Sequence, residues 1–226
     1  MLSLKLGLSL NTVTPRGGWS PSDEANLEAW YQNKVGITLN GSDVSTWADS
    51  STNSHDMVQA TATEQPAYNA STGALTFASA DVNNLQTTSQ ISLSGVFTIG
   101  IKLNPSAVNV SVLADNTTAG EFLKVQTSSV FRVKIDNTQV DIDLDSGSFG
   151  DDYLVITRNS SNLITLYRNG TAQADTETLA GTADIDAIGV RRTDQNPYAG
   201  TIKEIQIYDT ENSTLTANIN DYLSNL

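Results

Sequence analysis

The chain has 226 residues, of which 25 are Asp or Glu and 12 are Lys or Arg, so its formal net charge is −13. A surface this acidic repels a phosphate backbone, and we therefore expect no nucleic-acid partner. The sequence has no cysteine, which excludes disulfides and cysteine-ligated metals. It also lacks an apolar run of the roughly 18 residues that a membrane helix needs, so we expect no membrane span, no signal peptide and synthesis in a cytoplasm.

Residues 2–10 read LSLKLGLSL and alternate between leucine and small or polar residues. This period of two predicts an extended strand with one face made of leucine. The leucines are Leu2, Leu4, Leu6, Leu8 and Leu10. A run rich in Gly and Pro follows, so we divide the chain into a strand or arm with its linker, residues 1–20, and one domain, residues 21–226. The strand either opens the domain's own sheet or docks on a neighbouring subunit by strand addition.

The segment that begins at Ser20, SPSDEANLEAWYQ, carries a helix-start pattern, with a serine cap, proline at the first helical position and acids in the first turn. It predicts one or two helical turns, with Leu27, Trp30 and Tyr31 facing the core at helical spacing. Trp47 follows closely. Because aromatic residues make up 7% of the chain, we interpret Trp30, Tyr31 and Trp47 as core anchors rather than a binding site.

From about residue 56 the hydrophobic period is two, which predicts many short antiparallel strands. Their expected ranges are 74–78, 95–103, 109–114, 120–126, 129–135, 138–144, 152–158, 162–168, 185–190 and 200–208. Asp136-Asn137 and Asn169-Gly170 predict tight hairpins, the second of type I′. A short amphipathic helix, capped by Ser213 or Thr214, closes the chain. The apolar positions of this helix are Leu215, Ile219, Tyr222 and Leu223.

Candidate catalytic and zinc-binding groups are scarce. His55 is the single histidine, and the sequence has no Gly-x-Ser-x-Gly motif around which a serine triad could form. Zinc sites with several imidazole or thiolate ligands are excluded by the residue counts. We therefore interpret His55 as a hydrogen-bonding residue of a turn and expect no catalytic residue.

Three carboxylates, Asp141, Asp143 and Asp145, alternate with apolar residues and share one face of a predicted strand. Such a row is usually a solvated face. Calcium is the functional alternative, because this ion prefers clustered carboxylate oxygens. A straight strand spaces these groups about 7 Å apart, so a calcium site would need further ligands from a loop, such as Asp151 and Asp152.

A polar loop between two late strands gathers two guanidinium groups, amides and a tyrosine that we expect to be exposed. Its candidate contact residues are Arg191, Arg192, Asp194, Asn196 and Tyr198. Polar forks beside an aromatic ring suit a sugar or a protein surface. The alternative is an ordinary long hairpin loop.

Three parts of the chain resemble segments of a known domain family. The first is LEAWY at 27–31 followed by VSTWADS at 44–50, and the second is LYRNG at 166–170. The third runs from GVR at 189–191 through GTIKEIQIY at 200–208 into the closing helix. With them, residues 21–226 resemble the concanavalin A-like, or laminin-G-like, jelly-roll domains of many bacteriophage virion proteins. The resemblance implies an all-β, antiparallel jelly-roll β-sandwich with a short N-terminal helical turn and a short C-terminal helix. The Glu-x-Asp-x-x-Glu pattern of laminarinase-type sandwich hydrolases is absent, and the legume-type metal-site pattern is not recognisable.

Such sandwiches serve as lectins, enzymes, adhesins and structural proteins alike. The resemblance and the leucine strand predict a non-enzymatic virion protein, of the capsid decoration, cement or fibre type. We expect it to bind other virion proteins, such as the major capsid protein, or further copies of itself. The alternative is an adhesin for host surface glycans, and a glycan hydrolase is a third hypothesis. We expect no cofactor, with calcium as the single candidate.

Overall fold

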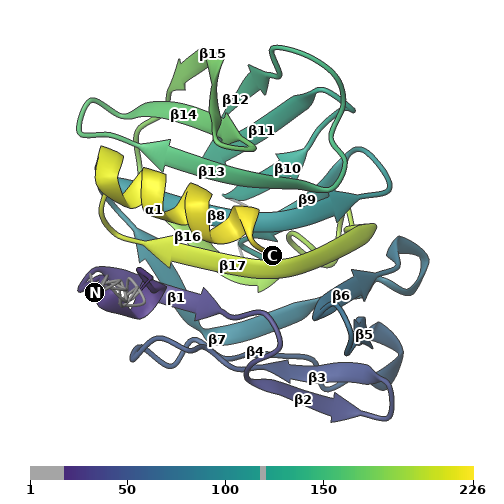
Figure 1. Cartoon of the computed structure of the whole chain (residues 1–226). Coiled ribbons are helices and arrows are strands. Elements are labelled where there is room, and N and C mark those ends of the chain that lie inside the picture. Colours follow the sequence, from purple (N-terminus) through teal and green to yellow (C-terminus); the bar gives the residue numbers. More distant parts are fainter. Residues whose placement is uncertain (1–17, 118–120) are drawn as a thin grey trace, which may run out of the picture.

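The structure is a computed structural model that describes residues 18–117 and 121–226. In these residues the chain is built of antiparallel strands, short 3-10 turns and one helix, α1, Ser213–Ser224. The strands pack as two layers, which confirms the predicted antiparallel sandwich (Figure 1). The predicted leucine strand at residues 2–10 lies outside the described residues. In the described part of the chain, no helix has both the length and the apolar character needed to span a membrane.

The front layer in Figure 1 is built around the long strand β17, which pairs with β8 along one side and with β1 and β6 along the other. It continues from β8 through β13 and β14 to β15, and β5 extends it beyond β6. Its strands are β1 (Leu27–Tyr31), β5 (Ala67–Asn69), β6 (Ala74–Phe77), β8 (Phe97–Pro105), β13 (Asp152–Arg158), β14 (Leu163–Arg168), β15 (Thr171–Thr178) and β17 (Gly200–Tyr208).

The second layer lies behind the first and runs in the order β2, β3, β4, β7, β16, β9, β10, β11, β12. Its strands are β2 (Ile37–Asn40), β3 (Asp43–Trp47), β4 (Met57–Val58), β7 (Leu85–Leu93), β9 (Val110–Ala114), β10 (Phe122–Val125), β11 (Val130–Ile135), β12 (Thr138–Asp143) and β16 (Ala183–Ile188). Alternate residues of these strands face the core, as the period of two predicts.

The aromatic residues of the N-terminal third anchor two different apolar clusters. Tyr31 and Trp47 are buried in the main core, with ring centroids 5.7 Å apart. Trp30 points the other way and lies under α1, where its ring meets Tyr222 at 6.4 Å. Its indole N–H donates to the buried carboxylate of Glu204 at 2.6 Å. Burial of all three confirms that they are structural anchors.

The closing helix α1 covers the outer face of the front layer (Figure 1). Leu215, Ile219 and Leu223 are buried there, as the amphipathic pattern predicts. Gly100 on β8 makes the close approach possible, since a Cβ at this position would lie 2.5 Å from Ile219 Cγ2. The helix cap is Asn212, whose side chain accepts the N–H of Leu215, so the prediction of Ser213 or Thr214 was wrong by one or two residues.

The predicted N-terminal helix is shorter than expected. Ser20 does cap a helical turn and Pro21 does open it, but the turn is a single 3-10 turn, Pro21–Asp23. Leu27, Trp30 and Tyr31 lie in the strand β1 instead. The prediction of helical spacing failed because pairing with β17 decides the conformation of this segment more strongly than its local pattern does.

Both predicted hairpins are present. Asp136 and Asn137 join β11 to β12 with φ of 46° and 65°, and Asn169 and Gly170 join β14 to β15 with φ of 50° and 79°. Two central residues with positive φ are what a type I′ turn requires, and this turn follows the twist of the paired strands. The second of these hairpins therefore has the predicted type.

Candidate functional site

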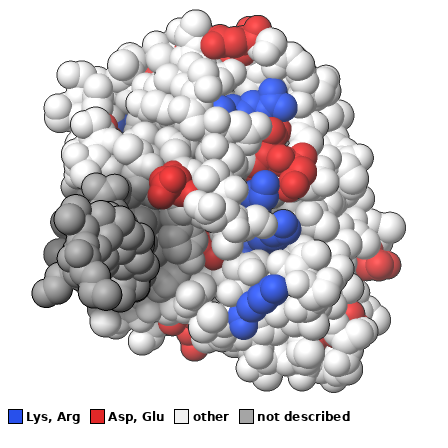
Figure 2. Space-filling model, viewed as in Figure 1, with Lys and Arg blue, Asp and Glu red and all other residues white. Residues whose placement is uncertain are grey.

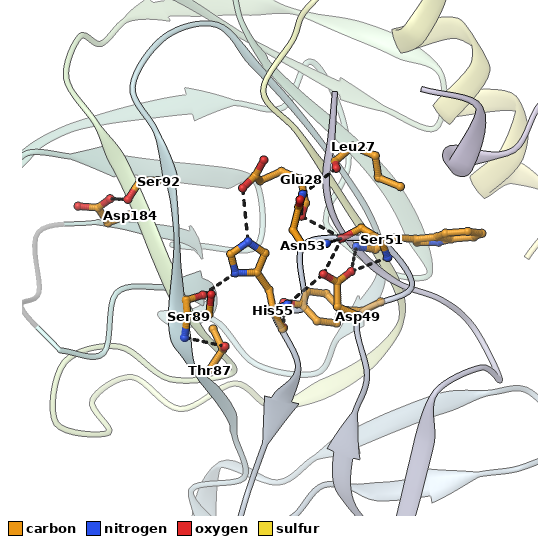
Figure 3. Close-up of polar contacts among 12 residues, drawn as sticks. Leu27, Glu28, Asp49, Ser51, Asn53, His55, Thr87, Ser89, Ser92 and Asp184 are labelled. Atoms are coloured by element: carbon orange, nitrogen blue, oxygen red, sulfur yellow. Dashed lines mark hydrogen bonds and ion pairs between the residues drawn. The ribbon is translucent and has the colours of Figure 1, made fainter. Parts of the chain in front are cut away.

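The loop after β3 is organised by a single carboxylate (Figure 3). Asp49 accepts the backbone N–H groups of Trp30 at 2.8 Å, Ser51 at 2.8 Å and His55 at 3.1 Å, and the hydroxyl of Ser51 at 2.6 Å. The side chain of Asn53 donates to the carbonyl of Glu28 at 2.9 Å. These bonds occupy the free edge of β1, so the loop protects that edge from pairing with another chain.

The imidazole of His55 is buried between the β1 strand and β7 (Figure 3). Its Nδ1 lies 2.6 Å from the carbonyl oxygen of Ser89, and its Nε2 lies 3.4 Å from Glu28 Oε1. Both ring nitrogens therefore face acceptors, and neither is aligned with a hydroxyl that it could activate as a nucleophile. His55 joins two segments of the fold, in line with its interpretation as a hydrogen-bonding residue.

The three aspartates considered for calcium have separate surroundings. Asp141 is held by both nitrogens of an Arg132 fork, at 2.5 and 2.7 Å. Asp145 accepts the N–H of Ala174 at 2.9 Å and so joins the β12 end to the edge strand β15, while the side chain of Asp143 is exposed. Among residues 18–117 and 121–226, no three acidic or histidine side chains form a group that could hold a metal ion.

The front layer carries two ion pairs, one on each of its faces. On the outer face, Lys102 of β8 lies 3.1 Å from Asp151. Arg168 on β14 lies 3.0 Å from Asp152, and both residues are on the core-facing side, since Arg168 pairs with Leu154 and Asp152 with Leu103. Figure 2 shows the outer side of this layer, where basic and acidic atoms are neighbours in one band and uncharged atoms cover most of the remaining surface. The helix α1 covers part of this face.

The outer face of the second layer is different, because a polar row crosses four strands there. Lys124 on β10 lies directly opposite Ser111 on β9 and Arg132 on β11, and Arg132 lies opposite Asp141 on β12. Residues directly opposite each other share a face of the sheet. The pairing of Lys124 with Arg132 places two positive charges side by side, which is unfavourable for folding.

One aromatic ring lies among these cations. Arg191 Cζ is 5.2 Å from the ring centroid of Phe122, and the ammonium nitrogens of Lys124 and Lys134 are each 5.8 Å from it. We call Phe122, Lys124, Arg132, Lys134 and Arg191 the basic face. It gathers four of the chain's 12 Lys and Arg residues in a protein of net charge −13. Phe122 is 6% exposed, so the cations cover the ring rather than leave it open as a platform.

Lys124 has the least favourable surroundings of the basic face. The residue is 5% exposed, and in the described part of the chain its ammonium makes no hydrogen bond or ion pair. Burial lowers the pKa of Lys124 to about 8, with further lowering by Arg191 and Arg132 and an opposing effect of Asp141. Beside it in the row, the buried hydroxyl of Ser111 also lacks a hydrogen-bond partner.

The loop after β16 supplies part of this face. Arg191 donates from Nε to the side-chain oxygen of Asn196 at 2.7 Å, which holds its guanidinium over Phe122. Asp194 is exposed and bonds to the side chain of Asn116, and Arg192 is exposed.

Tyr198 differs from the expectation. It is fully buried, its ring packs edge-on against Phe77 at 5.8 Å, and its hydroxyl donates to the carbonyl of Thr201. The predicted exposure was wrong because the chain turns back into the core at this residue before it enters β17.

Buried carboxylates lie next to the basic face, at the ends of β9, β10 and β16. Burial raises the pKa of Glu121 to about 7, with further raising by Asp115 and Asp184, while a bond from the backbone N–H of Asp136 opposes the shift. Burial likewise raises the pKa of Asp186, although the backbone of Asn116 and the hydroxyl of Thr117 donate to it, each at 2.6 Å. Both groups are held in protein hydrogen bonds, and burial shifts both toward the protonated form.

Sequence reasoning found Arg191 and Asn196 but missed Phe122, Lys124, Arg132 and Lys134. A signal was present, because the cations alternate with apolar residues in two consecutive predicted strands and must therefore share an outer face. The contribution of the distant Arg191 depends on the position of β16 beside β9, which the sequence does not indicate.

Comparisons with known proteins support the fold. No protein-family model matches the chain, and no curated protein matches its sequence. The binding domain of Paraclostridial Mosquitocidal Protein 1 has a similar structure, with a TM-score of 0.61 and 14% identity over 87% of this chain and 52% of that one. This chain thus spans about half of the length of that structure.

A second similar structure is domain 4 of AbnA, a GH43 extracellular arabinanase from Geobacillus stearothermophilus, in complex with arabinotriose. Its TM-score is 0.58 with 14% identity, over 87% of this chain and 98% of that domain. At such low identity, both likenesses establish a shared β-sandwich fold and nothing further.

Proposed function

We propose that the protein is a non-catalytic domain that recognises a glycan through the basic face and the loop that follows β16. The observation that carries this proposal is the contrast between the two outer faces. On the face under α1, Lys102 is paired with the carboxylate of Asp151, whereas Lys124 and Arg191 of the basic face have no carboxylate partner in the described part of the chain. Guanidinium and amide groups carry paired N–H donors that bind the hydroxyl and acidic groups of sugars.

The shared fold supports the same proposal. The arabinanase domain that this chain resembles over most of its length was described in complex with an oligosaccharide, arabinotriose. His55 is held between Glu28 and the carbonyl of Ser89, and Asp141 is held by Arg132, so neither group is available as an acid or base for glycoside hydrolysis. Binding without cleavage is therefore the activity that this arrangement fits best.

A glycan array tests the proposal directly. The full chain is applied with and without calcium, beside the variant Arg191→Ala and the control Lys34→Ala, whose site is exposed and lies outside the basic face. We expect wild type and the control to bind the same glycans and Arg191→Ala to lose most of the signal. Absence of any glycan binding contradicts the proposal, and release of reducing ends from a bound glycan contradicts its non-catalytic part.

A second candidate is a structural component of a virion that assembles through the leucine strand at residues 2–10. One strand edge favours it. Within the described residues β2 pairs with β3 on one side and with no strand on the other. Val35 and Leu39, which flank the core-facing Ile37, are 44% and 47% exposed at this edge. A strand with one leucine face would add to β2 and cover both side chains.

The absence of cysteine makes this second candidate easy to test by cross-linking. Two differently tagged copies carry Ser9→Cys and Thr38→Cys, and oxidation is expected to link the two tags. Links confined to one chain contradict assembly through this edge. Deletion of residues 1–12 is expected to remove the protein from purified virions while its fold persists, and continued incorporation would contradict the virion proposal.

A further inference from the structure

We infer that the basic face holds one anionic group of its ligand, a carboxylate or a sulfate ester, between the ammonium of Lys124 and the guanidinium groups of Arg132 and Arg191. This inference rests on the proposed function, because it specifies the chemistry of the glycan as acidic. It predicts that neutral sugars bind weakly and that an isolated anion binds at the same place.

Among the described residues, Lys124 has no counter-charge although most of the residue is removed from water. Loss of hydration is costly for an ion that has no partner, even where its end keeps some contact with solvent. Lys124 is 5% exposed and has no ion pair or hydrogen bond in the described part of the chain. Its hydrocarbon stem can cover Phe122, but stem packing alone does not require an unpaired ammonium.

The carboxylate of the polar row is already engaged. Asp141 lies across the strands in the same polar row, but both of its oxygens accept bonds from the fork of Arg132. It therefore reduces the positive charge of the row without neutralising Lys124. Lys124, Arg132 and Arg191 therefore lie near one carboxylate of this row, that of Asp141.

The fold holds these cations close together, which lowers the stability of the folded state. Lys124 faces Arg132 directly across two strands, and Arg191 is fixed over the shared ring of Phe122 by its bond to Asn196. Like charges brought together by the fold itself are a local conflict of the kind found at functional sites. An anion relieves this conflict, and binding then stabilises the folded protein.

The geometry favours a planar or tetrahedral oxyanion. Arg132 uses Nε and Nη2 on Asp141 and Arg191 uses Nε on Asn196, so each guanidinium offers the N–H groups that remain to an oxyanion, and the ammonium adds a point charge. Sugar carboxylates and sulfate esters share this chemistry, and a matched series of ligands separates them. Lactose, 3′-sialyllactose and 3′-sulfolactose have the same neutral core and differ in carrying no acid, a carboxylate or a sulfate.

The first measurement uses inorganic sulfate alone. The full chain is titrated with sodium sulfate at constant ionic strength and followed by amide NMR shifts, with Lys124→Met and the control Lys34→Met in parallel. We expect saturable shifts in β10, β11 and the loop after β16 for wild type and Lys34→Met, and at least a tenfold weaker response for Lys124→Met. Arg132→Gln serves as a second variant should Lys124→Met fold poorly. The absence of saturable shifts, or equal shifts in both lysine variants, overturns the inference.

The second measurement is calorimetric titration with the three lactose ligands. We expect one or both acidic ligands to bind at least tenfold more tightly than lactose, with the advantage lost in Lys124→Met and reduced by salt. Equal binding of all three by wild type overturns the anion site while the proposed glycan function stands. If sulfate binds saturably at Lys124 but no glycan on the array binds, the anion site is supported and the proposed function is contradicted.

Discussion

Two polar clusters of this molecule are built in opposite ways. In the loop after β3, the carboxylate of Asp49 accepts four hydrogen bonds, and the ring of His55 has an acceptor at each nitrogen. In the basic face, Lys124 lies without a partner opposite Arg132. The polar groups of the first cluster bond to one another, so a structural role accounts for them. The second leaves charge for something outside the chain to satisfy, which is the property expected of a binding site.

The largest change in the free energy of unfolding is expected when the hydrogen bonds of Asp49 are lost. Asp49→Ala removes the acceptor of four hydrogen bonds, and we expect the free energy of unfolding to fall by about 3 kcal/mol. Chemical denaturation at pH 7 measures it. The matched control is Asp56→Ala, since Asp56 is exposed and accepts the N–H of Asp49, and we expect a loss below about 1 kcal/mol. Equal losses in the two variants would show that the Asp49 network is not the main support of this loop.

A substitution in the basic face is expected to raise the free energy of unfolding rather than lower it. Lys124→Met keeps an apolar stem over Phe122 and removes one of two facing positive charges, so we expect the free energy of unfolding to rise by about 1 kcal/mol while sulfate binding is lost. Thermal unfolding and the sulfate titration measure the two effects on one sample. If Lys124→Met is less stable than wild type and still binds sulfate, Lys124 supports the fold and does not bind the anion.

A pH dependence follows from the neighbouring acid group. The pKa of Glu121 is about 7 in the folded protein against an ordinary value of 4.5. Its contribution to stability is therefore present below about pH 4.5 and is lost as the pH rises through 7. We expect Glu121→Gln to stabilise the protein at pH 8 by up to about 1 kcal/mol and to change little at pH 4. An equal change at both pH values would contradict the raised pKa.

The smallest stability effect is expected at Asp141. Asp141→Asn breaks a half-exposed ion pair with Arg132, which is worth at most about 0.5 kcal/mol, but it also frees the guanidinium. We therefore expect sulfate affinity to rise about threefold, measured in the same NMR titration. Weaker sulfate binding by this variant would indicate that Asp141 positions Arg132 for the ligand rather than competing with it.

The sequence predicted the sandwich, its two tight hairpins and its closing helix because each depends on local alternation or turn chemistry. It did not predict the short strands β2 to β5. It also missed the longer strands β7 and β15, whose segments are mostly polar and show no regular apolar alternation. It treated Asp141, Asp143 and Asp145 as one row, because the fork of Arg132 and the edge of β15 become visible after strands pair. It assigned Arg191 to a candidate loop, but the ring that holds this residue, Phe122, comes from a distant strand.

Lys124 is, in the proposed site, a cation without a counter-charge that receives an anion. Its pKa can be measured directly from the ¹³Cε shift of the selectively labelled lysine, with Lys124→Met used to assign the signal. We predict a value of about 8 in the free protein and a clear rise toward the ordinary 10.5 in saturating sulfate. A value near 10.5 that sulfate does not change would contradict the account.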